Sequence, residues 1–313
     1  MFELYLMDGL KNYDIQSNQH EQFLSKECTI IQRRITTTGP EPPMQEINMT
    51  DEIKDGMGDG NDPSAMKEIQ GRKILFGGLC GSYNYNLNEE GSDKDYHLYL
   101  LPTIDDIYKG NTYSKSEVTE ILDYASWDLR RLPEMMWKAN PNVIEVLYSS
   151  QRFINDVKFI PLVEKLFSMR DDIASMNLPY MWKASYGIIH SEIKDLDRRD
   201  PDLIQEFGYN TKVAMHALRT MRTVAKYAVG DFKGACRCDE RSRAELLRVK
   251  HGGVYKDLEE ARDDLQRRLE LMKSQYEAYF MEKEPVRETY EKVEDICRSI
   301  TMEHLRTILR EWC

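Results

Sequence analysis

The order of apolar and polar residues divides this chain into a strand-forming part and a helix-forming part. Short apolar runs bounded by turn residues predict three strands, over residues 72–76, 94–101 and 117–124. A short helical segment over 65–70 should lead into the first strand. From about residue 126 onward the apolar residues recur with helical spacing instead. The pattern therefore favours a small β-sheet followed by helices.

Leu129, Leu132 and Met136 space as one helix face, and Asn140 should cap a short helix with Pro141 in its first turn. Further helices are expected between Gly, Pro or polar joints, over 161–175, 178–196, 211–229, 240–249, 256–283 and 285–311. The segment 256–283 is mostly charged, which is typical of a solvated amphipathic helix.

The helix over 211–229 has the clearest periodicity. An apolar stripe recurs along it, made of Ala214, Leu218, Met221 and Ala225. A second stripe, turned away from the first, is polar and basic, made of Lys212, His216, Arg219, Thr223 and Lys226. We expect one face to pack and the other to be basic.

The first part of the chain is punctuated by Gly and Pro over residues 39–65, which predicts a linker or mobile arm. Strands are plausible before it, near 2–6 and 29–38. We therefore divide the chain into an N-terminal extension with linker (1–66), a sheet-containing core (67–155) and a helical domain (156–313). The expected fold class is α+β, a small mixed β-sheet with flanking helices followed by a helical C-terminal domain.

Composition narrows the classes of function. A chain of 313 residues can bury a large core, so neither disulfides nor a structural metal is required. The formal net charge of -11 excludes bulk attraction of polyanions and leaves local contacts. Only Cys236 and Cys238 lie close together, and no second pair completes a zinc site, so reduced thiols are expected. No run reaches the ~18 apolar residues of a spanning helix, and a cytoplasmic protein without membrane contact is expected.

The residues that carry chemistry concentrate between Gly77 and Pro102. On a strand, Asp93 and Asp95 would point to the same face with Cα atoms ~6.6 Å apart, while Lys94 and Tyr96 would point to the other. Two carboxylates at this spacing can share Mg²⁺ or Mn²⁺, which neutralise triphosphate oxygens in phosphoryl transfer.

Two further features would complete a phosphate-handling site. A third carboxylate is expected from a neighbouring strand, with Asp123 the first choice and Asp128 the reserve. Gly81 lets the backbone come close to a phosphate, and the Ser82 hydroxyl and nearby N–H groups can donate to its oxygens. An isolated Asp-x-Asp or Gly-Ser pair is common by chance. Their conjunction with flanking strands indicates a functional site.

The same residues carry a resemblance to a known family. Gly81-Ser82, Ser92-Asp93-Lys94-Asp95 and the apolar strand that follows resemble the signature of the predicted nucleotidyltransferases of the DNA polymerase β superfamily, of the type associated with RNA repair. The resemblance continues through segments that begin at Asp123, Asn140, Lys212 and Glu245, and covers roughly residues 68 to 262. The chain departs from the family pattern at Tyr83, where most members carry Arg, and at Asn86, where most carry Gly.

The resemblance implies an EC 2.7.7-type enzyme that moves a nucleoside monophosphate from an NTP to an acceptor hydroxyl or phosphate and releases pyrophosphate. Asp93, Asp95 and Asp123 fall on the catalytic metal ligands of the family. The nucleotide-binding residues that the resemblance implies are Gly81, Ser82, Tyr83, Ser92, Lys212, His216 and Arg219. RNA ends, tRNA, a protein hydroxyl and a small molecule are all open as acceptors.

Rival interpretations stay open from the sequence. A non-catalytic nucleotide-sensing or protein-interaction module could use the same fold, and a helical scaffold could carry Asp-x-Asp by chance. For Glu145 the sequence leaves two roles open, structural hydrogen bonding and support of the site. For Lys250 and His251 the two open roles are the end of a helix and a contact with the substrate.

Overall fold

The structure, a computed structural model, describes residues 66–118 and 123–312. The predicted strands near 2–6 and 29–38 and the linker over 39–65 lie outside the described residues. Within them, six strands form one mixed sheet: β1 (Glu68–Ile69), β2 (Arg72–Cys80), β3 (Asp95–Leu100), β4 (Ser114–Val118), β5 (Asp123–Asp128) and β6 (Arg152–Ile154). The order is β1-β2-β3-β5-β4, with β6 also paired to β2. The expected α+β class is confirmed.

The strand predictions need two corrections. The helical segment expected over 65–70 is wrong, because Glu68–Ile69 forms β1 and turns back through Gln70 and Gly71, both with positive φ. The single strand expected over 117–124 is also wrong. Ser114–Val118 and Asp123–Asp128 are separate strands that pair antiparallel, so Asp123 begins a strand instead of ending one.

Buried apolar side chains lie on both faces of the sheet, and the alternation of β3 divides its side chains between them. Tyr96, Leu98 and Leu100 belong to a small apolar cluster on one face. Asp95, His97 and Tyr99 alternate with them and therefore point to the other face. Tyr99 belongs to the main core cluster, which continues through the helices to Ile300. Asp95 thus lies on the helix-facing side of the sheet.

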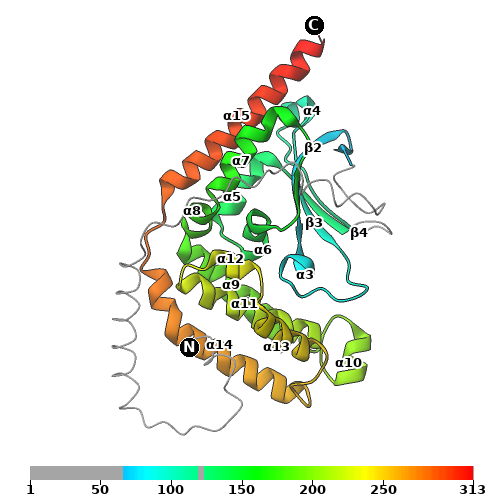
Figure 1. Cartoon of the computed structure of the whole chain (residues 1–313), viewed down its shortest axis with the longest axis vertical. Helices are drawn as coiled ribbons and strands as arrows, with labels where there is room; N and C mark the ends of the chain where they lie inside the picture. Colours follow the sequence, from blue (N-terminus) through cyan, green and yellow to red (C-terminus); the bar gives the residue numbers. More distant parts are fainter. Residues whose placement is uncertain (1–65, 119–122, 313) are drawn as a thin grey trace. The chain divides into compact units, whose positions relative to one another are not determined.

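The longer helices are α7 (Ile160–Ser168), α9 (Leu178–Lys194), α11 (Thr211–Ala228), α13 (Glu240–Lys250), α14 (Leu258–Met281) and α15 (Arg287–Trp312). They follow the predicted pattern, except that the single helix expected over 161–175 is two helices, α7 and α8 (Arg170–Ser175), separated at Met169. The other short α-helices of the described residues are α3 (Gly81–Asn84), α4 (Ile104–Lys109), α5 (Leu132–Trp137), α6 (Pro141–Ile144), α10 (Pro201–Phe207) and α12 (Phe232–Cys236). Asn140 caps α6 with Pro141 in its first turn, as predicted. Figure 1 shows α15 passing α5, α7 and α8, which it contacts.

Helix α11 lies at the centre of the helical part and packs against α9, α12, α13 and α14. Its apolar stripe is largely buried, as expected. The second stripe is less uniform than predicted, because Thr223 is buried and donates to the Arg219 and Ala235 carbonyls. Lys212, His216 and Arg219 remain accessible at the N-terminal half of the helix. The side chains that can meet a ligand therefore gather near the start of α11.

Other sequence expectations have mixed outcomes. Helix α14 buries Leu265 and Leu269 and leaves most of its charged residues outside, as predicted for an amphipathic helix. Cys80, Cys236, Cys238 and Cys297 are free thiols. In the described part of the chain, no helix is long and apolar enough to span a membrane. The described residues belong to one compact unit, Gly60–Cys313, and the division of the chain at 66 and 155 stays a prediction.

Candidate active site

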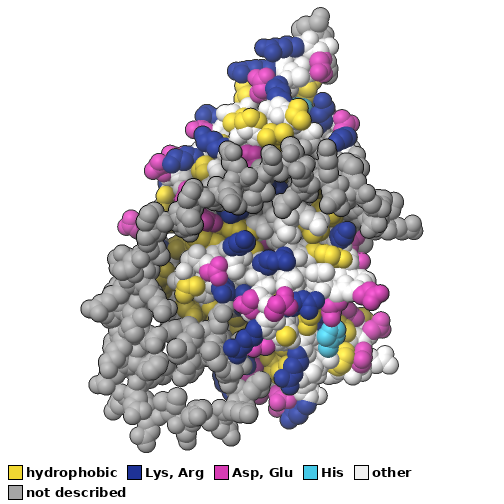
Figure 2. Space-filling model, in the orientation of Figure 1, with side chains coloured by type: hydrophobic (Ala, Val, Ile, Leu, Met, Phe, Trp, Pro, Cys, Tyr) yellow, Lys and Arg dark blue, Asp and Glu magenta, His cyan; other side chains and the backbone are white. Residues whose placement is uncertain are grey.

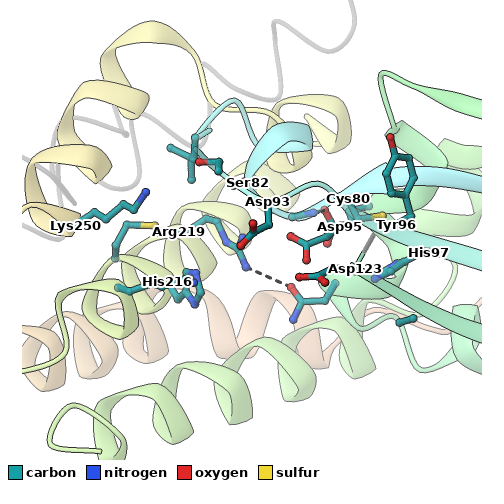
Figure 3. A pocket seen from close by; sticks show the side chains of 18 of the residues that line it. Cys80, Ser82, Asp93, Asp95, Tyr96, His97, Asp123, His216, Arg219 and Lys250 are labelled. Atoms are coloured by element: carbon teal, nitrogen blue, oxygen red, sulfur yellow. Dashed lines mark hydrogen bonds between the residues drawn. The ribbon is translucent and has the colours of Figure 1, made fainter. Parts of the chain in front are cut away.

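One pocket of about 750 Å³ is lined by every predicted site residue except Tyr83. The sheet contributes Asp95 and Asp123, and the segment before β3 contributes Ser92 and Asp93. The turn after β2 adds Gly81 and Ser82, and α11 adds Lys212, His216 and Arg219. In Figure 3 the three aspartates and Arg219 point into the same space. Residues separated by more than 130 positions in the sequence thus meet.

The two strands that carry Asp95 and Asp123 fix their relative position. Strands β3 and β5 run parallel, and Asp95 is the register partner of Asp123. Asp93 lies just before β3 in a segment outside the strand, whereas the sequence predicted it on the strand. Lys94 approaches the Tyr83 ring, with its Nζ 6.0 Å from the ring centroid. The two carboxylates that neighbouring strands bring together are therefore Asp95 and Asp123, whereas the sequence predicted Asp93 and Asp95 on one strand.

The Asp95 carboxylate is in an unfavourable environment for a negative charge. Burial against the pocket wall raises its pKa, and the nearby Asp123 charge raises it further. The Lys212 and Arg219 charges lower the pKa of Asp95, but by less than burial and Asp123 raise it. A cation between the two carboxylates would remove their repulsion.

Gly81 packs directly on Asp95. Its φ of +63° lies in the left-handed region, and a Cβ built on it would stand 2.3 Å from Asp95 Oδ2. Only a glycine meets both conditions, because it has no Cβ to clash and no cost for positive φ. The Gly81 N–H donates to Glu145 Oε2 at 3.1 Å. That N–H is therefore taken by protein, whereas the sequence expectation left it for phosphate.

Glu145 is the buried link behind this turn. It is only 3% exposed, and its backbone carbonyl accepts from Asn84 Nδ2 at 3.2 Å. Burial raises its pKa to about 7, although Arg219 and the Gly81 N–H favour the ionised form. Glu145 supports the Gly81 turn and also lines the pocket. It therefore combines the two roles that the sequence left open.

The three predicted residues of α11 differ in charge and in partners. Arg219 lies over the Tyr85 ring at 4.0 Å and donates to Asn142 Oδ1 at 3.4 Å (Figure 3). Burial lowers the pKa of His216 to about 3, and the Arg219 and Lys212 charges lower it further. His216 is therefore neutral at physiological pH, whereas the sequence placed it in a basic stripe. Lys212 is exposed.

The two residues that depart from the family pattern have structural partners. Asn86 adopts a left-handed conformation with φ of 59°, as an Asn in place of Gly can. Its side-chain amide donates to the Cys238 carbonyl and to Glu240 Oε1, both at 3.2 Å. Tyr83 packs on the small cluster outside the pocket. Asn86 thus ties the loop before Asp93 to the start of α13.

A second tie holds the same loop to the end of α13. Glu89 accepts from Lys250 Nζ at 2.6 Å and lies 2.7 Å from His251 Nε2. The Lys250 hydrogen bond lowers the pKa of Glu89, with His251 acting in the same direction. Lys250 is the last residue of α13 and also lines the pocket. Helix α13 therefore ends at Lys250, and the interpretation of Lys250 and His251 as the end of a helix is confirmed.

Asp128, the reserve third acid, lies at the opposite end of β5 from Asp123. It is fully buried, accepts from the Arg130 backbone N–H at 2.9 Å and pairs with the Arg130 guanidinium. It does not line the pocket. Its partners give it a structural role, which leaves Asp123 as the only one of the two near Asp95.

The sequence did not indicate several residues that line the pocket. Ile188 and Glu192 come from α9, Met215 from α11, and Glu117 from β4. No local motif surrounds them. The signal that was available is their spacing, since Ile188 and Glu192 are one helical turn apart and share a face.

The donor chemistry of the site suits a hard divalent cation, because carboxylate oxygens are the ligands that Mg²⁺ and Mn²⁺ prefer. A cation bound there would also relieve the repulsion between the Asp95 and Asp123 carboxylates. Among the described residues, however, no three His, Cys, Asp or Glu side chains stand at a spacing that could hold a metal ion.

Comparison with known proteins identifies a family that the chain matches. A family model described as RlaP, RNA repair pathway DNA polymerase beta family, matches residues 61–298. The match covers the sheet, the pocket and most of the helices. No curated protein matches the chain.

Proposed function

The chain belongs to the RNA repair pathway DNA polymerase beta family, and from this premise we propose that it is a metal-dependent nucleotidyltransferase. The proposed reaction moves a nucleoside monophosphate from an NTP to an acceptor hydroxyl or phosphate, with an RNA end as the acceptor that the family suggests. The observation that carries the proposal is the pairing of Asp95 with Asp123 in one pocket with Gly81, Ser82 and Arg219.

The proposed roles follow from the position of each group. Asp95 and Asp123, joined by Asp93, would hold Mg²⁺ or Mn²⁺, which neutralises phosphate oxygens and lowers the pKa of an attacking hydroxyl. The Ser82 hydroxyl would donate to a phosphate oxygen. Lys212 and Arg219 would balance the negative charge of the triphosphate from the opposite wall.

The transfer step balances without a further reactant. An acceptor oxygen attacks the α-phosphorus, the bond between that phosphorus and the bridging oxygen breaks, and pyrophosphate leaves. The acceptor proton passes to solvent. Because His216 is neutral and its pKa is about 3, we assign it a polar contact with the nucleotide and no role as a phosphate-binding cation.

The surface is compatible with a short acceptor end. On the face drawn in Figure 2, Lys and Arg side chains of the described residues alternate with Asp and Glu. Long polynucleotides bind through continuous basic surfaces that neutralise many phosphates. An acceptor that presents only its terminus to the pocket avoids that requirement.

The test is transfer itself. The full chain is incubated with Mg²⁺ or Mn²⁺, each α-labelled NTP and a panel of RNA ends, tRNA, protein and small hydroxyl acceptors, and pyrophosphate release and label transfer are measured. Asp95→Ala and Asp123→Ala should abolish transfer. Asp105→Ala, which removes an exposed carboxylate of α4 paired with Lys109, should leave it unchanged. Equal transfer by the wild-type protein and the three variants would refute the mechanism. Tight NTP binding without transfer would favour a nucleotide sensor.

A further inference from the structure

Most acidic side chains that line the pocket already have a partner or a proposed role. Three are held by protein donors (Glu89, Glu117 and Glu145), three are the proposed metal ligands (Asp93, Asp95 and Asp123), and Glu90 is exposed to water. The remaining lining carboxylate is that of Glu192 on α9. A carboxylate inside a pocket for a triphosphate repels the ligand, so its presence calls for a reason.

Glu192 is a half-buried residue, and one of its two carboxylate oxygens lacks a donor. Its Oε2 is buried and has no hydrogen-bond partner among the described residues. Burial raises its pKa, which shows that the Arg199 and Arg219 charges do not compensate for the loss of water. Buried polar atoms in native proteins nearly always have a partner. A ligand that brings N–H donors into the pocket would supply one.

The surroundings of Glu192 fit a flat aromatic ring. Ile188 lies one turn before it on α9, and Met215 lies on the neighbouring α11, and both line the pocket. An apolar wall beside a single polar group is the usual composition of a small-molecule site, where the polar group sets orientation and specificity. Lys212 and Arg219 on α11 line the same pocket beside Met215, so a nucleotide can place its phosphates and its base against one pair of helices.

We propose that Glu192 accepts hydrogen bonds from the N1–H and 2-amino groups of a guanine base, which makes GTP the preferred nucleotide. This inference rests on the proposed nucleotidyltransferase function. An ionised carboxylate has two acceptor oxygens and no donor. Guanine presents two adjacent N–H donors on one edge, whereas adenine and cytosine place a ring-nitrogen acceptor beside their amino group. Uracil flanks its single N–H with two carbonyl acceptors.

The experiment measures binding, so it needs no acceptor. The full chain is titrated by calorimetry with the Mg²⁺ complexes of GTP, ITP, ATP, CTP and UTP. GTP should bind about 10- to 100-fold more tightly than ATP or UTP, the effect of a hydrogen bond to a charged group. ITP, which lacks the 2-amino group, should bind about 10-fold more weakly than GTP.

Two variants distinguish the loss of base recognition from the loss of one negative charge in the pocket. Glu192→Gln offers one donor and one acceptor, which match adenine, so the GTP preference should fall by about 10-fold or more and ATP should gain. Glu90→Gln removes the same charge from the exposed part of the lining and should change the affinity for all nucleotides alike. Equal affinity of the wild-type protein for GTP and ATP, or an unchanged preference in Glu192→Gln, would overturn the inference and leave the proposed function intact. If no nucleotide binds, both fall.

Discussion

Substitution of Gly81 by Ala tests whether the turn after β2 holds Asp95 in place. The new Cβ would stand 2.3 Å from Asp95 Oδ2, whereas ordinary contacts begin near 3.4 Å, so the carboxylate or the turn would shift by about 1 Å. The φ of +63° adds the cost of a left-handed alanine, ~1–2 kcal/mol. We expect Gly81→Ala to lower the free energy of unfolding by on the order of 2 kcal/mol.

We expect Gly81→Ala to reduce the rate of transfer more than it reduces the stability of the fold. A misplacement of ~1 Å at reacting groups can cost about 100-fold in rate. We therefore expect pyrophosphate release to fall by about that factor, with Mn²⁺ binding weakened in the same variant. The assays are urea denaturation, Mn²⁺ titration followed by electron paramagnetic resonance, and NTP turnover.

Gly71 provides the matched control. It has a φ of +74° in the β1–β2 turn, and a Cβ built on it meets nothing within 4 Å. Gly71→Ala therefore carries the backbone cost alone, ~1 kcal/mol after the loss of unfolded-state entropy, and should leave Mn²⁺ binding unchanged. If Gly81→Ala and Gly71→Ala behave alike in stability and in Mn²⁺ binding, the turn does not position Asp95.

Two further predictions concern buried carboxyl groups. Burial raises the pKa of Glu145 from 4.5 to about 7, so the folded protein retains a proton that the unfolded chain releases, and its contribution to stability is lost as pH rises from about 4.5 through 7. Urea denaturation should show this slope in the wild type and a flatter one in Glu145→Gln. The pKa of Asp106 is about 2, because hydrogen bonds from Arg72 and Thr103 outweigh burial. Asp106→Asn should cost about 2 kcal/mol near neutral pH, and the same titration should show this difference vanish as pH falls from about 4 to 2.

Local patterns predicted most helices because each has its own start and stop signals. Asn140 with Pro141 fixed the start of α6, and the apolar recurrence around Leu218 fixed the buried side of α11. The segment over 117–124 was assigned wrongly for the opposite reason. Two antiparallel strands joined there leave the same alternation as one strand, and only the partner strand distinguishes them.

The candidate site shows the same division between local and long-range information. The Gly81 turn and the Asp95 strand are adjacent in sequence, and their motif was visible. Glu192 carries no motif, and its significance depends on one buried carboxylate oxygen without a donor and on the neighbouring helix that carries Met215. Likewise, the neutral state of His216 follows from its loss of contact with water and from the nearby Arg219 and Lys212 charges. Spacing places these residues on a helix face but does not give their environment.

The charge of the pocket bears on how an acidic chain could bind the polyanionic substrate that we propose. Acidic side chains outnumber basic ones in the lining, where Lys212, Arg219 and Lys250 are the cations of the described residues. Lys250 is engaged by Glu89, so a free triphosphate meets more repulsion than attraction. In the proposed function a nucleotide complexed with a divalent cation would reverse this balance, because the cation would be attracted to Asp95 and Asp123 and would shield the phosphates. The net charge of -11 is then compatible with the proposed nucleotide binding, since Asp95 and Asp123, which would repel free phosphates, would attract the metal that accompanies them.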